Sequence, residues 1–188
     1  MKRNASRLLG SFFAAAALAL FAVLPGYAVD PPKATLNISS PAFPSEGMIP
    51  AKYTCEGGNV SPSLSWTGVP ASAKTLALIC DDPDAPGGTW VHWILYNLPA
   101  ATSALAEKVD STPTLPGGAR QGTNDFGKIG YGGPCPPAGK AHHYFFKLYA
   151  LDIRLGLKPG ATKKELLQAM DGHVVAEGML MGKYQRRK

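Results

Sequence analysis

The sequence has 188 residues, with 19 Lys and Arg against 13 Asp and Glu and a formal net charge of +6. This length suits one domain with a sizeable core, and the moderate charge, without interleaved basic and aromatic residues, excludes a nucleic-acid-binding surface as the main feature. The 17 prolines and 21 glycines separate short segments rich in β-branched and aromatic residues, which favours an all-β domain.

The first 28 residues have the features of a secretory signal peptide. Three basic residues precede an apolar run at 8–24, and Ala28 stands at the expected cleavage position. A transmembrane anchor is the alternative, but Gly10 and Ser11 interrupt the run. We therefore expect one exported domain at 29–188, periplasmic or secreted, with no stable membrane anchor. Removing the three basic residues lowers the formal charge from +6 to +3.

Short strands and one helix are predicted along the remaining chain. Segments with the composition and spacing typical of β-strands lie at 35–39, 63–66, 75–80, 91–97, 142–152 and 174–184. Thr162 and Glu165 have the spacing of a capping box before the apolar residues Leu166 and Met170, and Gly172 follows as a stop. The sequence thus predicts a short helix packed on a β domain.

Three cysteines in an exported chain allow one disulfide and one free thiol. Cys80 ends an apolar run, where it fits as a small buried hydrophobe. Cys55 and Cys135 both lie in loops rich in glycine and proline, so we expect these two to be bonded. The histidines and cysteines show no CxxC or HxxxH spacing, so no metal site is predicted.

Histidines on two predicted strands are the first candidates for a functional site. Side chains alternate faces along a strand, which places His92 on the same face as Ile94 and Tyr96, and His142 on the same face as Tyr144. The two imidazoles and the Tyr144 phenol would converge if the strands were adjacent or ended at one rim.

Two aspartates in the turn DPDAP, Asp82 and Asp84, are placed to orient one of these imidazoles. Each residue also has a structural explanation. The aspartates suit a turn, and His92 suits a hydrogen-bonded core position. His143 points away from its neighbour, and His173 follows a helix end as a charge partner.

Several long motifs extend this interpretation. The segments YTCEGGNVSPSLSW, DDPDAPGGTWVHW, NDFGKIGYGGPCPPAGKAHHYFFKLYALD and GHVVAEGMLMGKYQ, in this order, resemble the phosphatidylethanolamine-binding protein family, and most of all its bacterial Raf kinase inhibitor-like branch. The resemblance covers 35–184. It implies an antiparallel β-sandwich with Greek-key connections and a small anion-binding pocket, without metal or cofactor.

The resemblance also implies which residues bind the ligand: Asp82, His92, Gly133, Pro136, Pro137, His142 and Tyr144. Asp84 and Pro86 would support the loop. The motif GGPCPP departs from the simpler loop of the eukaryotic members, and the sequence shows no sign of their long C-terminal helix.

The function expected from these residues is non-catalytic binding of a phosphate or carboxylate headgroup, with a regulatory or inhibitory role toward a protein partner. A small hydrolase is one alternative, with His92 or His142 as general base, although no Gly-x-Ser-x-Gly motif is present. A secreted interaction module or protease inhibitor is another, and it would act through the exposed loop 112–128.

Overall fold

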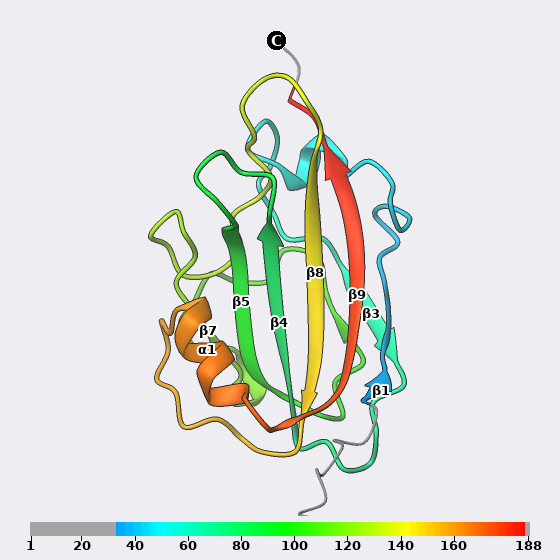
Figure 1. The fold of residues 1–188 in the computed structure, drawn as a ribbon, viewed down its shortest axis with the longest axis vertical. Helices are drawn as coiled ribbons and strands as arrows, with labels where there is room; N and C mark the ends of the chain where they lie inside the picture. Colours follow the sequence, from blue (N-terminus) through cyan, green and yellow to red (C-terminus); the bar gives the residue numbers. More distant parts are fainter. Residues whose placement is uncertain (1–32, 187–188) are drawn as a thin grey trace, which may run out of the picture. The chain divides into compact units, whose positions relative to one another are not determined.

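The structure is a computed structural model that describes residues 33–186. The expected signal peptide lies outside them. Within this range the chain forms a six-stranded sheet in the order β1-β9-β8-β4-β5-β7, a three-stranded sheet in the order β2-β3-β6, and one α-helix (Figure 1). The all-β prediction is therefore confirmed.

The bounds of the strands are β1 Ala34–Thr35, β2 Asn37–Ser39, β3 Leu64–Thr67, β4 Thr75–Asp82, β5 Trp90–Pro99, β6 Ala104–Leu105, β7 Arg120–Gln121, β8 His142–Leu151 and β9 Val174–Tyr184. Helix α1 spans Lys163–Met170, and the 3-10 turns η1 and η2 span Ala51–Tyr53 and Pro116–Gly118. All pairings between these strands are antiparallel except that of β1 with β9.

The segment predicted as one strand at 35–39 contributes to both sheets. β1 pairs with β9, whereas β2 pairs with β3 in the smaller sheet. Leu36, between them, is buried, and its backbone N–H donates to the carbonyl of Glu177. The chain thus crosses from one sheet to the other at a residue that continues the apolar pattern.

The main core lies between the two sheets. Leu64 and Trp66 of β3 belong to the same cluster of buried side chains as Leu78, Trp93 and Phe146 of the larger sheet. Burial of one such side chain stabilises the fold by about 1.5–3 kcal/mol. The two sheets therefore form a sandwich over a shared hydrophobic layer.

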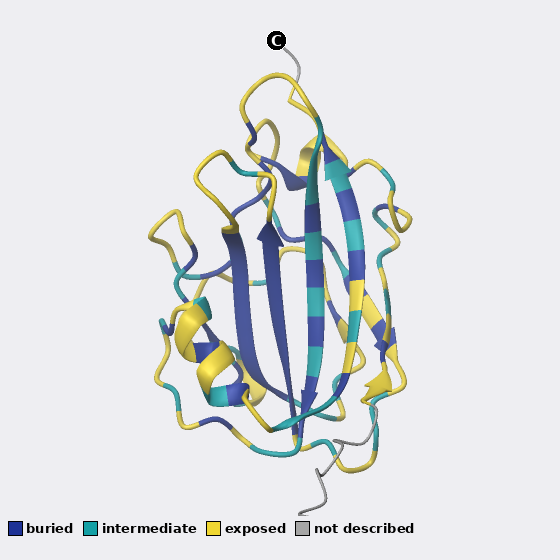
Figure 2. Ribbon diagram, in the orientation of Figure 1, coloured by how far each residue is buried: buried dark blue, intermediate teal, exposed yellow. Residues whose placement is uncertain are grey.

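A second core lies on the opposite face of the larger sheet, under α1. The Thr162 side chain caps the helix together with Glu165, as the sequence predicts, and Leu166 and Met170 pack with Ile79 and Ile94 of the sheet. Figure 2 shows the result: β4 is buried along its length and β5 at all but its two end residues, whereas buried and more exposed residues alternate along much of β8 and β9. Within 33–186, no helix is long and apolar enough to cross a membrane.

Candidate functional site

The predicted site residues come together at one end of the strands of the larger sheet. At this end of the sheet β4 ends with Asp82, β5 begins with Trp90, and β8 begins with His142 (Figure 1). β4 lies between β5 and β8, so the two histidine strands are not adjacent. The imidazoles converge because their strands share a rim, which is the second of the two arrangements that the sequence allows.

A β-bulge in β5 determines where His92 points. Cys80 pairs with Trp93, but the next pair is Asp81 with Val91, so His92 is an extra residue in the ladder. The prediction that His92 shares a face with Ile94 and Tyr96 is therefore wrong. The bulge turns His92 toward the face of Tyr144, and the two ring centroids lie 5.1 Å apart.

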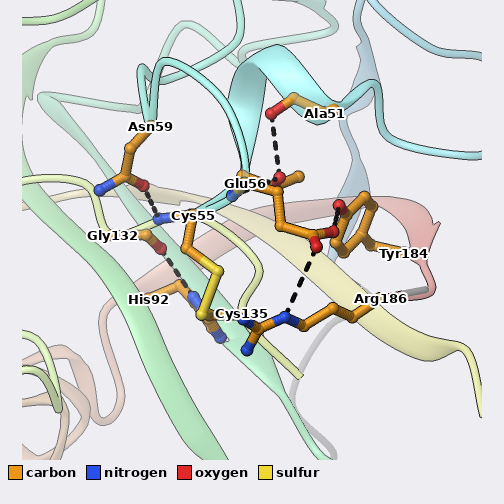
Figure 3. Close-up of a disulfide and its surroundings, with 11 residues drawn as sticks. Ala51, Cys55, Glu56, Asn59, His92, Gly132, Cys135, Tyr184 and Arg186 are labelled. Atoms are coloured by element: carbon orange, nitrogen blue, oxygen red, sulfur yellow. Dashed lines mark hydrogen bonds and ion pairs between the residues drawn. A yellow bond between two sulfur atoms is a disulfide. The ribbon is translucent and has the colours of Figure 1, made fainter. Parts of the chain in front are cut away.

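His92 is oriented by a backbone carbonyl rather than by a carboxylate. Its Nδ1 lies 2.6 Å from the carbonyl oxygen of Gly132 (Figure 3). Because a carbonyl only accepts, Nδ1 carries a hydrogen and donates it. Burial lowers the pKa of His92, opposed by the Gly132 carbonyl and by Asp82. At neutral pH the ring is therefore neutral, with Nε2 as a hydrogen-bond acceptor.

Asp82 orients the second imidazole. Its Oδ2 lies 2.8 Å from Nδ1 of His142, and its Oδ1 accepts the backbone N–H of Asp84 at 2.8 Å. The Asp82 side chain is only 4% exposed, so this pair is largely shielded from water. With Nδ1 bound to the carboxylate, Nε2 is the nitrogen that His142 can offer to a ligand.

The neighbouring aspartate and histidine form a separate pair at the surface. Oδ2 of Asp84 accepts from the backbone N–H of His143 at 2.9 Å and lies 2.6 Å from Nδ1 of the same residue. This hydrogen bond lowers the pKa of the Asp84 carboxyl group. Asp84 therefore ties its turn to the start of β8 and does not face the site.

The loop 132–137 closes the site and is anchored at several points. Gly133 donates its N–H to Oδ1 of Asn59 at 2.7 Å, and the carbonyl of Pro134 accepts from the N–H of Cys55 at 3.1 Å. A disulfide joins Cys55 to Cys135, the pair expected from the sequence (Figure 3). Gly133 has no room for a side chain, since a Cβ atom would lie 2.3 Å from the carbonyl oxygen of Tyr53.

These elements enclose a cavity of about 160 Å³. Six of the residues that the resemblance names as ligand-binding or loop-supporting line it, namely Asp82, Pro86, His92, Pro136, Pro137 and His142. Gly133 instead lines a neighbouring cavity. Tyr144 lies beside His92 and is buried, and its hydroxyl makes no hydrogen bond to another described residue. Burial and the nearby Asp82 carboxylate raise the pKa of Tyr144, so its hydroxyl stays a donor.

Sequence reasoning missed two aromatic residues at this cavity. Trp90 and Phe126 line it, and their side chains are 38% and 40% exposed. Their rings meet edge to face with centroids 5.4 Å apart. Both lie inside the quoted motifs, in the segments GGTWVHW and NDFG, and a large aromatic residue beside a glycine-containing turn was the available signal in the sequence.

Within the described part of the chain, no group of three or more His, Cys, Asp or Glu side chains is arranged to hold a metal ion. The disulfide also removes Cys135 as a free thiol. The site therefore consists of two fixed imidazoles, one carboxylate, a buried phenol and an aromatic and proline wall.

Comparisons with known proteins agree with the resemblance. The phosphatidylethanolamine-binding protein family profile matches residues 39–185. A UPF0098 protein of Methanothermobacter thermautotrophicus is 54% identical over 151 residues, which cover 80% of this chain and 99% of that protein. A UPF0098 protein of Chlamydia trachomatis is 46% identical over 156 residues, which cover 80% of this chain and 99% of that protein.

Two solved structures are similar over nearly their full length. One is a homolog of the phosphatidylethanolamine-binding protein from Chlamydia trachomatis, with a TM-score of 0.74 and 45% identity over 81% of this chain and 98% of that one. The other is Escherichia coli YbcL, described as a member of the mammalian family, with a TM-score of 0.75 and 34% identity over 81% of this chain and 99% of that one. The chain belongs to the phosphatidylethanolamine-binding protein family.

Proposed function

We propose that this chain is an exported, non-catalytic binding protein whose cavity takes a small anion, a phosphate or carboxylate headgroup. One observation carries the proposal: two histidines with fixed orientation, His92 and His142, line the same cavity of about 160 Å³. A cavity of this size suits a headgroup and is too small for a protein segment with its own fold.

The charges at the two imidazoles favour an acid that keeps one proton. His92 is neutral near pH 7 and offers Nε2 as an acceptor. His142, paired with the Asp82 carboxylate, donates from Nε2 when it is protonated. Hydrogen phosphate complements both, because its P–OH group donates to His92 while an anionic oxygen accepts from His142. A phosphate monoester does so as its monoanion, the form that predominates below a pKa of about 6.

Catalysis has weaker support than binding. A hydrolase needs a nucleophile or an activated water beside the histidines. Cys135, whose sulfur could act as a nucleophile beside the histidines, lines the cavity but is bonded to Cys55. Nδ1 of His92 is bound to a backbone carbonyl and Nδ1 of His142 to a carboxylate. Such bonds could also orient a general base, but the described residues that line the cavity include no Ser, Thr or free Cys that could act as the nucleophile.

Action through the loop 112–128 also has weaker support. This segment contains β7, and the side chain of Gln121 is fully buried. Its Oε1 accepts from Nε1 of Trp93 at 2.8 Å, and its Nε2 donates to the carbonyls of Asp110 and Thr112 at 2.6 and 2.8 Å. The middle of the segment is thus fixed to the sheet, which leaves its exposed residues in two short stretches, within 112–117 and 125–128.

A thermal-shift titration tests the proposal. The chain is titrated with phosphate, acetate, phosphoethanolamine and phosphotyrosine. A ligand that binds only the folded state, at about 100 times its Kd, stabilises it by about 2.7 kcal/mol. We expect at least one of the phosphate ligands to raise the melting temperature, and His142→Ala to abolish the shift.

The matched control is His143→Ala, which changes the adjacent histidine outside the cavity. This variant should keep the ligand-induced shift. The proposal fails if none of the four anions raises the melting temperature, or if His142→Ala and His143→Ala respond to them alike.

A further inference from the structure

A second cavity adjoins the first and is part of no function derived above. Its volume is about 150 Å³, close to that of the first. Phe126 and Cys135 line both cavities, so an aromatic ring and a disulfide sulfur form their common wall. A molecule that leaves the first cavity over this wall enters the second.

The common wall is held in place on both sides. Phe126 packs against Gly132, where a Cβ atom would lie 2.6 Å from Cδ2 of the ring. The ring also meets His92 edge to face, with centroids 5.4 Å apart, and the backbone N–H of Phe126 donates to Oδ1 of Asn124 at 3.1 Å. The glycine thus permits the ring to lie as a fixed partition between the cavities.

The polar side chains of the second cavity supply hydrogen-bond donors. The N–H of Gly133 donates to Oδ1 of the Asn59 side chain. The NH₂ group of the same amide therefore points in another direction. That NH₂ group forms no hydrogen bond to another described residue. Lys128 also lines the cavity, and its backbone N–H donates to Oδ1 of Asn124 at 3.1 Å.

The charge of the second cavity is positive. Within 33–186, the ammonium group of Lys128 has no ion-pair partner. No Asp or Glu lines this cavity, in contrast with Asp82 in the first. The Phe126 ring and the disulfide supply an apolar part of the wall. The chemistry therefore suits a short aliphatic group that ends in an acid.

We propose that the two cavities bind a single ligand with two acid groups joined by a short aliphatic spacer. One acid lies between His92 and His142, which rests on the proposed function. The spacer crosses the exposed edge of Phe126, and the second acid meets Lys128 and the amide of Asn59. Recognition of the second acid would distinguish this ligand from free phosphate and from simple monoesters.

The test is a calorimetric titration of the chain with matched compounds. Inorganic phosphate probes the first cavity alone. Unbranched alkylphosphonates and the α,ω-alkanediphosphonates of the same length, from one to five carbons, then measure what the second acid adds. At the best length we expect the diphosphonate to bind about fivefold more tightly than its monophosphonate, the upper range for an ion pair near a protein surface.

Two lysine variants locate the second acid. Lys128→Met should remove the preference for the diphosphonate, whereas Lys140→Met, which changes an exposed lysine that lines neither cavity, should keep it. The inference is overturned if phosphate binds but the two series bind equally at every length, or if Lys128→Met keeps the preference. If neither phosphate nor any monophosphonate binds, the inference fails because its first acid has no site, whereas the proposed function is judged by all four anions of the thermal-shift titration.

Discussion

Two neighbouring aspartates on β4 face opposite sides of the sheet and meet opposite surroundings. Asp81 points toward α1, is fully buried, and contacts two lysines, with Oδ1 at 2.8 Å from Nζ of Lys147 and Oδ2 bound by Lys163. Asp82 points toward the cavity and contacts one imidazole, that of His142. The same strand thus carries one carboxylate enclosed by cations and one whose partner borders a cavity.

The difference between the two sides shows what a buried carboxylate can contribute. The lysines at Asp81 link β4 to its neighbour β8 and to the start of α1, and this group lines neither of the two cavities described above, so its role is structural. The Asp82 pair leaves one edge of an imidazole available to a ligand. Four changes, taken from the largest expected effect to the smallest, test this division.

The largest effect is expected on the cavity side, from the disulfide. Cys55 and Cys135 are 80 residues apart in sequence, and closing so long a loop stabilises a fold by about 4 kcal/mol. The double change Cys55→Ser, Cys135→Ser should lower the free energy of unfolding by this amount, as measured with urea. It should also weaken phosphate binding, because the loop that orients His92 loses its covalent anchor.

Asp81→Asn should affect stability alone. The two lysines lose their counter-charge, but their side chains are 33% and 25% exposed and can turn to water. We therefore expect a loss of about 2 kcal/mol, below that for a fully buried pair. Asp152→Asn, at an exposed pair with His173, is the control and should change stability little. A loss of phosphate affinity in Asp81→Asn would contradict the division.

Asp82→Asn should have the converse effect. Its main consequence is loss of the charge-assisted hydrogen bond that orients His142. Such a bond is worth about 1.5 kcal/mol, which corresponds to roughly tenfold weaker phosphate binding. Calorimetric titration measures it, with Asp152→Asn again as control. The division between the two carboxylates would be contradicted if Asp82→Asn lowered the free energy of unfolding more than Asp81→Asn does and left the affinity for phosphate unchanged.

The smallest effect is expected in the pH dependence of stability. Burial lowers the pKa of His92 below its ordinary value of 6.5. Below pH 6.5 the unfolded chain therefore takes up a proton that the folded chain resists, and the free energy of unfolding falls as the pH falls through this window. Urea unfolding from pH 7 to pH 5 should show a flatter profile in His92→Gln. If the profiles of His92→Gln and of the unchanged chain were parallel, His92 would contribute nothing to the pH dependence of stability.

The sequence predicted long elements better than short ones. The strand at 174–184 was predicted to the residue, because the stop at Gly172 and the basic tail after Tyr184 bound a run of 11 mostly apolar residues. β6 and β7 have two residues each, too few for any periodicity, and were missed. The crossing of the chain from one sheet to the other at Leu36 was not predicted either, because the pattern of a strand does not show which sheet the strand joins.

The candidate site was predicted in its residues and not in its geometry. The motif resemblance named Asp82, His92 and His142, and all three line the cavity. The alternation rule nevertheless assigned His92 to the wrong face, because a bulge is a property of two paired strands and leaves no mark in one. Phe126 was overlooked as a cavity residue for a related reason: its position depends on Gly132, which meets it only in the folded chain.

The extra residue in β5 has a consequence for how this protein can vary. Trp93 fills the space between the sheets, and His92 beside it reaches the same side without replacing it. In the proposed function, recognition and packing therefore fall to separate positions on one strand. A change at 92 can alter which ligand is chosen while the interior keeps its tryptophan, and the scaffold can acquire a new specificity without being rebuilt.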